Sequence, residues 1–341
     1  MKTIADFRSD TFTKPTPGML DAMMLAEVGD DVFGEDPAVN ELEAIVAGLF
    51  GKAAALYCPS GTMSNQIAIK VHTLPGDEVI CSDLAHVFVY EGGGIAFNAG
   101  CQARTLHGER GLLTAKQVEA AINPDDVHRA RTSLVCLENT ANRGGGACYD
   151  FQEILRIRDV CKAHGLGFHL DGARLFNALV AKGETPTQYG AAFDTISICL
   201  NKGLGCPMGS VLVGSEAFIK EARRVRKKLG GGLRQAGFMA AAGIYAVEHQ
   251  VARLDEDHCN ARDIADALLS RPFVGQMWPV ETNIIIFELL APYTAASFAE
   301  KLAAQGIRVG VISPTQIRMV THLDITPDMV QHTLDAILHL H

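Results

Sequence analysis

A single lysine, Lys202, directly follows a short apolar run and is itself followed by glycines. Residues 195–200 have the apolar character of a buried strand, and the segment 203–209 interrupts that pattern. An amine at the end of a buried strand is a candidate Schiff-base nucleophile, whereas an isolated loop lysine is usually a solvated charge. The rest of the chain must decide between these two interpretations.

Two further polar segments border predicted strands and could share a site with this lysine. They are the pair Asp171 and Arg174, after the apolar run 166–170, and the turn Ser60, Gly61 and Thr62, between the run 53–57 and the helical pattern 63–72. In open α/β sheets ligands collect at the carboxyl ends of strands, and a helix N-terminus favours an anion. An amine, an acid and an anion turn at one sheet edge match what pyridoxal 5′-phosphate requires.

The elements that must position these residues alternate along the chain. Runs with the length and composition of strands alternate with segments of helical apolar spacing, such as 39–51, 63–72 and 151–164. The expected strands are residues 53–57, 78–81, 133–137, 166–170, 195–200 and 210–213. This alternation predicts an α/β fold with a mostly parallel, doubly wound sheet.

The pattern changes near residue 251. The expected elements there are helices at 257–269 and 295–305, strands at 283–287, 307–312 and 316–321, and a final helix. We therefore predict a large α/β domain over residues 1–250, whose N-terminal segment contributes to the active site, and a small α+β domain over residues 251–341.

The balance of charged residues limits the kinds of partner that we expect the protein to bind. Thirty Lys and Arg stand against 39 Asp and Glu, giving a formal net charge of -9, which argues against nucleic acid or an anionic membrane as a partner. The basic run 220–228 departs from this balance, and a solvated helix face is its ordinary interpretation. A small-molecule substrate is therefore the expected partner.

Cysteine usage and the absence of apolar segments bear on the compartment. The nine cysteines are scattered without a Cys-x-x-Cys pair, so neither a disulfide framework nor a metal site is predicted. The first residues lack the apolar core of a signal peptide, and no uncharged apolar stretch approaches the length of a membrane span. We expect a cytoplasmic protein.

Seven short motifs are spread over nearly the whole chain. They are Arg8-Ser-Asp-Thr11, Gly29-Asp-Asp-Val-Phe-Gly34, Pro59-Ser-Gly-Thr62, His169-Leu-Asp-Gly-Ala-Arg174, Cys199-Leu-Asn-Lys-Gly-Leu-Gly205, Gly230-Gly-Gly-Leu-Arg-Gln235 and Arg318-Met-Val-Thr-His-Leu-Asp324. These motifs resemble those of the L-threonine aldolase family, low-specificity type. Each is weak alone, and together they are specific. The resemblance implies an aspartate-aminotransferase-like fold of PLP fold type I, pyridoxal 5′-phosphate as cofactor, and a homotetramer, a dimer of dimers with shared active sites.

The same resemblance implies a reaction and assigns roles by position. The reaction is retro-aldol cleavage of L-threonine, L-allo-threonine and related β-hydroxy-α-amino acids to glycine and an aldehyde. In catalysis Lys202 would be the Schiff-base lysine, Asp171 the partner of the pyridine nitrogen, and His86 the residue that stacks on the ring near the reacting hydroxyl. Further cofactor contacts are expected from Ser60, Gly61, Thr62, Arg174 and Asn201 and, across a subunit contact, from Lys227 and Arg234. The substrate carboxylate would be held by Ser9, Arg174 and Arg318, since a guanidinium fork fits a carboxylate.

Three positions depart from the family pattern. Ala141 occupies the place of a second histidine and can neither accept a proton nor bond a hydroxyl, so base duty falls to His86 or a water molecule. Phe33 replaces a tyrosine, and Asn201 replaces a serine before the lysine. These changes affect stereopreference and substrate range rather than the class of reaction.

Two alternatives stay open at this level. A pyridoxal phosphate amino-acid racemase on the same scaffold would need mainly a different substrate pose, and a noncatalytic relative would keep the fold without the chemistry. A nicotinamide dehydrogenase is excluded because no Gly-x-Gly-x-x-Gly turn joins an early strand to a helix.

Overall fold

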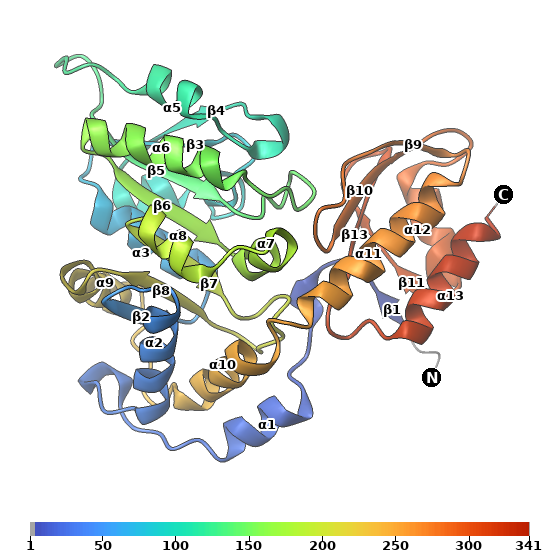
Figure 1. The fold of residues 1–341 in the computed structure, drawn as a ribbon, viewed down its shortest axis with the longest axis horizontal. Helices are drawn as coiled ribbons and strands as arrows, with labels where there is room; N and C mark the ends of the chain where they lie inside the picture. The colour runs from blue at the N-terminus through green and yellow to red at the C-terminus, as the bar shows by residue number, and fades with distance from the viewer. Residues whose placement is uncertain (1–3, 341) are drawn as a thin grey trace.

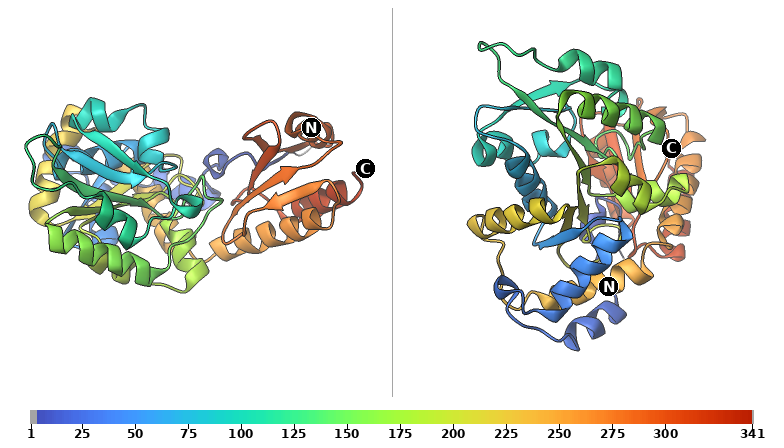
Figure 2. Two further views of the ribbon diagram at one scale, coloured as in Figure 1. Left: turned by 90° about the horizontal axis from the view of Figure 1, so that it is seen from above. Right: turned by 60° about the vertical axis from the view of Figure 1, so that its left-hand side comes forward.

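Two hydrophobic cores divide the chain, which a computed structural model describes over residues 4–340 (Figure 1). The larger core lies on one face of a seven-stranded sheet, whose other face carries two smaller clusters, and the second core lies on one face of a four-stranded sheet formed by the C-terminal part. The left view of Figure 2 shows the two sheets, with the helices that cover them, as separate bodies.

The large sheet has the strand order β2-β8-β7-β6-β5-β3-β4, with every neighbouring pair parallel except those made by β8. Its strands are β2 (Ala54–Cys58), β3 (Glu78–Ser82), β4 (Gln102–Leu106), β5 (Thr132–Glu138), β6 (Gly167–Gly172), β7 (Thr195–Cys199) and β8 (Ser210–Gly214). The predicted α/β fold with a mostly parallel sheet is confirmed. Strands β3 and β7 are buried along their whole length, as expected for a sheet covered on both faces.

Successive strand residues point to opposite faces, and each face has its own helices. One face packs against α2, α5, α6, α7, α8 and α10, and the other against α3 and α9. The helices are α1 (Pro17–Met24), α2 (Pro37–Leu49), α3 (Gly61–His72), α4 (His86–Val89), α5 (Ala115–Ala121), α6 (Phe151–His164), α7 (Leu175–Lys182), α8 (Pro186–Ala192), α9 (Glu216–Lys228) and α10 (Gly237–His249). The result is a three-layer arrangement, with helices on both sides of the sheet (Figure 1).

The small body is an antiparallel sheet of order β12-β13-β10-β9 covered by three helices. Its elements are α11 (Leu254–Leu269), β9 (Val274–Met277), β10 (Ile284–Leu289), α12 (Ala295–Ala304), β11 (Ile307–Arg308), β12 (Gly310–Val311), β13 (Gln316–Val320) and α13 (Pro327–Leu338). Strand β1 (Ala5–Asp6) pairs with β11, and Phe7 packs into the small core. Residues 5–7 therefore belong to the small body, and the chain crosses to the large body directly after them.

Most expected elements correspond closely to the observed ones, but the single strand expected at 307–312 is two short strands, β11 and β12, which belong to different sheets. Helix α6 has the predicted bounds, and each strand predicted in the large body exists within a residue or two at either end. Strand β4 was not predicted, because Gln102–Leu106 contains only two apolar residues and lies at the sheet edge with partly exposed side chains. No helix within residues 4–340 is long and apolar enough to cross a membrane.

Candidate active site

Five loops at the carboxyl ends of parallel strands supply the polar residues of one site. Gly61 follows β2, His86 follows β3, Asn142 follows β5, Asp171 ends β6, and Lys202 follows β7. The small body faces these strand ends, with Thr282 Oγ1 donating to Gly146 O at 3.1 Å. Ligands bind at such strand ends in open α/β sheets, so this is the place where a cofactor would be expected.

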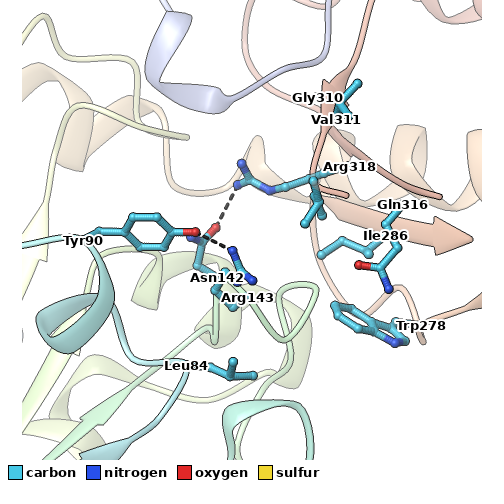
Figure 3. Close-up of a pocket in the computed structure, with 11 residues that line it drawn as sticks. Leu84, Tyr90, Asn142, Arg143, Trp278, Ile286, Gly310, Val311, Gln316 and Arg318 are labelled. Atoms are coloured by element: carbon cyan, nitrogen blue, oxygen red, sulfur yellow. Dashed lines mark hydrogen bonds between the residues drawn. The ribbon is translucent and has the colours of Figure 1, made fainter. Parts of the chain in front are cut away.

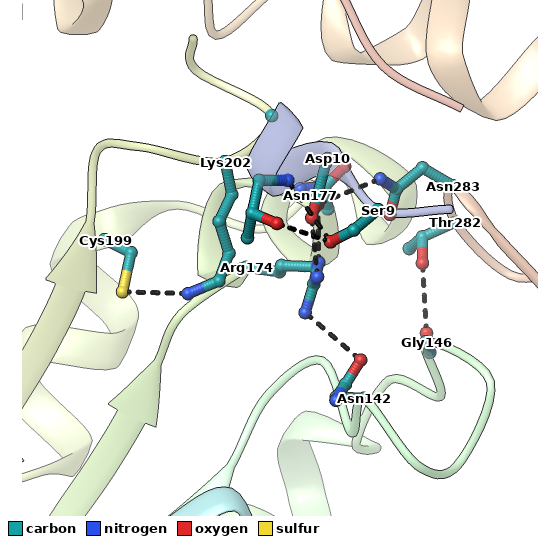
Figure 4. A network of polar contacts seen from close by, with 12 residues as sticks. Ser9, Asp10, Asn142, Gly146, Arg174, Asn177, Cys199, Lys202, Thr282 and Asn283 are labelled. Carbon is teal, nitrogen blue, oxygen red and sulfur yellow. Dashed lines mark hydrogen bonds and ion pairs between the residues drawn. The ribbon is translucent and has the colours of Figure 1, made fainter. Parts of the chain in front are cut away.

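Lys202 lies in the turn that joins β7 to the antiparallel strand β8. Leu200 N bonds Gly209 O at 3.0 Å and closes this turn. Gly209 has φ +117°, and a side chain there would collide with the ring of Tyr57, so only glycine fits. This loop directs the lysine amine back toward β7, and Nζ lies 3.2 Å from Cys199 Sγ (Figure 4).

The turn Ser60-Gly61-Thr62 opens α3, as the sequence predicted. Ser60 caps the helix by accepting from Met63 N at 3.2 Å, while the N–H groups of Gly61 and Thr62 have no acceptor among residues 4–340. A Cβ on Gly61 would lie 2.4 Å from Cys199 Sγ. Because Cys199 touches both Gly61 and Lys202, unpaired helix donors and the lysine amine share one site, and such donors are a ready anion-binding position.

Asp171 is buried and held from two sides. Its Oδ1 accepts from Ala173 N at 3.1 Å, and its Oδ2 accepts from Asn65 Nδ2 at 2.9 Å. Carboxylate oxygens have further acceptor capacity, so one more donor can be bound. Asp171 is thereby fixed as an acceptor at the centre of the site.

A hydrogen-bonded chain continues from Asn65 through the sheet and fixes the direction of each donor. Asn65 Oδ1 lies 3.1 Å from His169 Nε2, His169 Nδ1 lies 2.8 Å from Thr195 Oγ1, and that hydroxyl lies 2.8 Å from His72 Nε2. Burial lowers the pKa of His169 to about 3 and that of His72 to about 4, so both rings are neutral. With Asn65 Nδ2 donating to Asp171, only the tautomers that carry hydrogen on Nε2 satisfy the whole chain.

His86 is anchored by two buried carboxylates. Its Nδ1 bonds Glu91 Oε1 at 3.0 Å, and its backbone N donates to Glu138 Oε2 at 2.7 Å. Burial acts to lower the pKa of His86, but the hydrogen bond that its ring donates to Glu91 and the charge of Asp171 raise this pKa above its usual value. One ligand atom each of His86, Glu91 and Asp171 lies within 4.8 Å of the others, so this ring lies beside the central acid.

Two arginines converge on one oxygen atom at the boundary between the bodies. Arg174 Nη1 lies 3.4 Å from Asn142 Oδ1, and Arg318 Nη2 lies 2.8 Å from the same oxygen. Arg174 also donates Nε and Nη2 to Asp10, each at 2.6 Å (Figure 4). Burial lowers the pKa of Arg318 to about 10, with the like charge of Arg174 adding to the effect. A carboxylate in the position of this oxygen would bind both guanidinium groups more strongly than the neutral amide does, because it carries a negative charge.

Ser9 and Asn201 lie near this cluster but make few contacts of their own. Ser9 caps the short turn Asp10–Phe12, its Oγ accepting from Thr11 N at 3.2 Å. Asn201 precedes the lysine, is partly buried and has no hydrogen-bond partner among residues 4–340. Both side chains are therefore available to a ligand.

Lys227 and Arg234 are not brought to this site within one chain. Arg234 pairs with Asp30 at 2.7 Å in an exposed position. Lys227 lies at the end of α9 and lines a separate cavity of about 720 Å³ together with Phe33. The basic run is also not a simple solvated face, since Arg226 is buried and pairs with Asp31 at 2.9 Å.

Sequence reasoning missed several residues of the site. Asp10 stands inside the motif Arg8–Thr11, and a buried acid facing Arg174 could have been predicted there. Asn142 directly follows Ala141 but belongs to none of the seven motifs. Glu91 and Asn65 carry no sequence signal, because an acid five residues after a histidine and an amide on a helix are both ordinary. Ala141, at the place of a second histidine, is buried and packs near Gly111 and Gly144.

Taken together, the residues present fit pyridoxal 5′-phosphate. The unpaired N–H groups of Gly61 and Thr62 suit its phosphate, Lys202 offers the amine, and Asp171 keeps acceptor capacity for a ring nitrogen. Burial acts to lower the pKa of Lys202, but Cys199 and nearby carboxylates raise it, so the amine is charged when nothing is attached.

The sequence of the chain is similar to those of known proteins. The Beta-eliminating lyase family matches residues 6–291. The chain is 43% identical to the "Probable low-specificity L-threonine aldolase 2" of Arabidopsis thaliana, covering 97% of this chain and 95% of the relative. It is 42% identical to the "Low specificity L-threonine aldolase" of Escherichia coli K12, covering 95% of this chain and 96% of the relative.

Solved structures share the fold. A threonine aldolase of Leishmania major superposes with a TM-score of 0.85 at 22% identity, covering 98% of both chains. A structure described as SPT with PLP internal aldimine superposes with a TM-score of 0.77 at 18% identity, covering 98% of this chain and 86% of that one. At these identities the likeness shows the fold, which is the one predicted.

Proposed function

The chain belongs to the Beta-eliminating lyase family, among the low-specificity L-threonine aldolases, and on this premise we propose how its residues carry out the reaction. It is a carbon–carbon lyase that cleaves L-threonine, L-allo-threonine and related β-hydroxy-α-amino acids to glycine and an aldehyde, acetaldehyde from threonine. The arrangement that carries the proposal is the single site in which Lys202, the open helix donors of Gly61 and Thr62, and the two arginines meet.

Pyridoxal 5′-phosphate is the proposed cofactor, and when bound it supplies an electron sink conjugated to the substrate Cα. Lys202 would hold it through Nζ. Gly61 and Thr62 would donate their backbone N–H groups to its phosphate, and Ser60, Asn201 and Arg174 would make further contacts with the cofactor. Asp171 keeps a proton on the ring nitrogen, because a buried carboxylate favours the positive form of its partner.

The two arginines and Ser9 are proposed to bind the substrate carboxylate. In the structure Asn142 Oδ1 occupies the point between Arg174 and Arg318. A substrate carboxylate that replaces it fixes the orientation of the bonds at Cα, and orientation decides which bond can break.

His86 is the proposed base for the β-hydroxyl proton. Glu91 bonds Nδ1 of its ring, which leaves Nε2 for the substrate and stabilises the ring once it is protonated. Cleavage then moves the hydroxyl proton to His86, breaks the Cα–Cβ bond, and leaves Cα to take up a proton before glycine departs. Ala141 offers no second group for this duty.

We further propose a homotetramer whose contacts complete the active site. Large apolar side chains are strongly exposed in one chain, including Met24 (81%), Leu25 (83%), Phe33 (73%) and Phe97 (89%), and soluble monomers rarely leave such groups uncovered together. Lys227 lines a cavity together with Phe33, so a contact there would bring both to a neighbouring subunit, where Lys227 and Arg234 reach the phosphate. The mass in solution by light scattering tests the assembly.

Compartment and domain division are part of the same proposal. All nine cysteines are free, as suits the reducing cytoplasm. The proposed domains are residues 1–250, which carry the cofactor site but whose strand β1 and Phe7 pack with the small body, and residues 251–341, which carry Arg318.

The deciding experiment measures glycine and acetaldehyde from L-threonine with the cofactor-loaded protein, together with its visible absorbance. Lys202→Ala should remove the absorbance band and at least 10³-fold of the activity, roughly the loss seen for essential nucleophiles. Lys162→Ala, on the exposed side of α6, is the matched control and should behave as wild type. A yellow, active Lys202→Ala protein would overturn the assignment, and D-alanine from L-alanine without glycine from threonine would indicate a racemase.

A further inference from the structure

A cavity of about 340 Å³ opens beside Arg318, between the loop after β5 and the sheet of the small body (Figure 3). Neither Lys202, Asp171 nor the turn 60–62 lines it, so it is not the space assigned to the cofactor. It adjoins the point at which the substrate carboxylate is proposed to bind, because Asn142 and Arg318 belong to its wall. The cavity is therefore placed to receive the substrate side chain.

The cavity wall carries two positive charges and no negative one. Arg143 and Arg318 are its only Lys, Arg, Asp, Glu or His residues. Neither forms an ion pair with any carboxylate among residues 4–340. Arg143 Nη1 donates to Tyr90 Oη at 2.7 Å, and Arg318 Nε is buried without a partner. Arginines normally bind carboxylates or phosphates through their planar fork, so an anion is missing from the wall.

One substrate carboxylate accounts for one of these arginines only. Arg318 Nη2 already donates to Asn142 Oδ1, the position of the α-carboxylate, while Arg143 Nη1 donates to the Tyr90 hydroxyl instead (Figure 3). Threonine would leave Arg143 without an anion and would fill little of the volume, since its side chain beyond Cβ is a hydroxyl and one methyl. The apolar faces of Leu84, Trp278 and Ile286 suit a short carbon stem between the two ends.

We propose that this cavity is a subsite for an acidic side chain, and that the preferred substrates are β-hydroxy-α-amino acids ending in a second carboxylate, bound by Arg143. This rests on the proposed function and specifies its substrate class. The reaction is unchanged: the Cα–Cβ bond breaks, the β-hydroxyl loses its proton and becomes the aldehyde, and Cα gains a proton. The products are glycine and an aldehyde acid, which is glyoxylate when the substrate is β-hydroxyaspartate.

The test compares kcat/KM for L-threonine with that for the threo and erythro isomers of L-β-hydroxyaspartate and for β-hydroxyglutamate, using the cofactor-loaded protein. At least one acidic substrate should exceed L-threonine. Arg143→Met keeps the length of the side chain and removes its charge, and it should lower the ratio of acidic to neutral kcat/KM about 10- to 100-fold, the range for a lost charged hydrogen bond. Arg143→Lys keeps the charge and should restore part of the ratio.

A second measurement does not depend on turnover of the acid. L-aspartate should inhibit threonine cleavage with a lower inhibition constant than L-alanine, and Arg143→Met should abolish that difference. Equal loss on acidic and neutral substrates, or a preference for L-threonine over every acid, would overturn the subsite. Absence of glycine from every substrate would instead overturn the proposed function, so the two failures are distinguishable.

Discussion

Arg174 and Asp10 form a buried pair, with Nε and Nη2 of the guanidinium each 2.6 Å from a carboxylate oxygen. Burial acts to raise the pKa of Asp10, but the charge of Arg174 holds that pKa well below its usual range. The pair joins the N-terminal segment to the end of β6 and leaves only Nη1 of Arg174 facing Asn142. Asp10 thus balances the positive charge of Arg174 and also sets the orientation of its guanidinium group.

Asp10→Asn should therefore destabilise the protein and weaken substrate binding. An uncompensated buried charge costs about 3–5 kcal/mol, which denaturant unfolding would register. The same change should raise KM for L-threonine, because Arg174 loses its fixed orientation. Asp6→Asn, in the partly exposed pair with Arg8, is the control and should cost less than about 1 kcal/mol. Equal stability of both variants would contradict this account.

Asp171→Asn should keep the cofactor bound and slow cleavage severely. Asparagine retains the contacts to Ala173 and the size of the side chain, but it no longer favours a proton on the ring nitrogen. We expect a fall in kcat of at least about 10²-fold, as for removal of a group that stabilises developing charge. Near-normal turnover with full cofactor occupancy would exclude this role for Asp171.

His169→Leu should lower kcat through Asn65, which then loses the donor that fixes its amide. Asn65 can turn its oxygen toward Asp171, which replaces an attraction by a repulsion. By analogy with the outer partners of metal ligands, the loss in kcat should be about 10- to 100-fold with little change in KM. Asn65→Leu removes the same link and should give a comparable loss. If the pH profile of kcat in both variants were identical to that of the wild type, the hydrogen bonds from His72 to Asp171 would only support the fold.

The fold could be predicted because apolar periodicity reports burial directly. Strand β7 is apolar along its length and lies in the sheet centre, and α6 shows the spacing of an amphipathic helix, so both were found. Strand β4 was missed because an edge position demands little burial.

The site was predictable only where a residue stands out from its own neighbours in sequence. Lys202 and Asp171 end apolar runs, and this marks them. Glu91 and Asn65 act through contacts with His86 and Asp171 that no local pattern contains, since they come from different elements. The ion pair between Arg174 and Asp10 is likewise visible only in three dimensions.

Stability should depend on pH through Glu138. Burial, and then the charge of Asp171, raises its pKa to about 7, so the folded protein keeps a proton that the unfolded chain loses near pH 4.5. The folded state binds more protons between these values, so stability falls as pH rises from about 4.5 to 7 and then levels off. The shift corresponds to about 3 kcal/mol at most. Glu138→Gln cannot ionise, so the difference in Tm between wild type and variant should shrink over this range. A difference in Tm that stays constant from pH 5 to 8 would contradict this role of Glu138.

Weak discrimination between L-threonine and L-allo-threonine is expected because no side chain at position 141 can bond the β-hydroxyl. The two kcat/KM values should agree within about threefold, less than 1 kcal/mol of difference in transition-state energy. Ala141→His restores a polar group but must fit where the alanine Cβ packs beside Gly144, whose own Cβ would meet Arg110 O at 1.9 Å. We therefore expect a changed isomer ratio together with about 1–3 kcal/mol of destabilisation from overpacking. Ala141→Ser adds a hydroxyl without the bulk and separates the two effects. A strong isomer preference in the wild type would show that another group, such as His86 alone, already discriminates between the two configurations at the β-carbon.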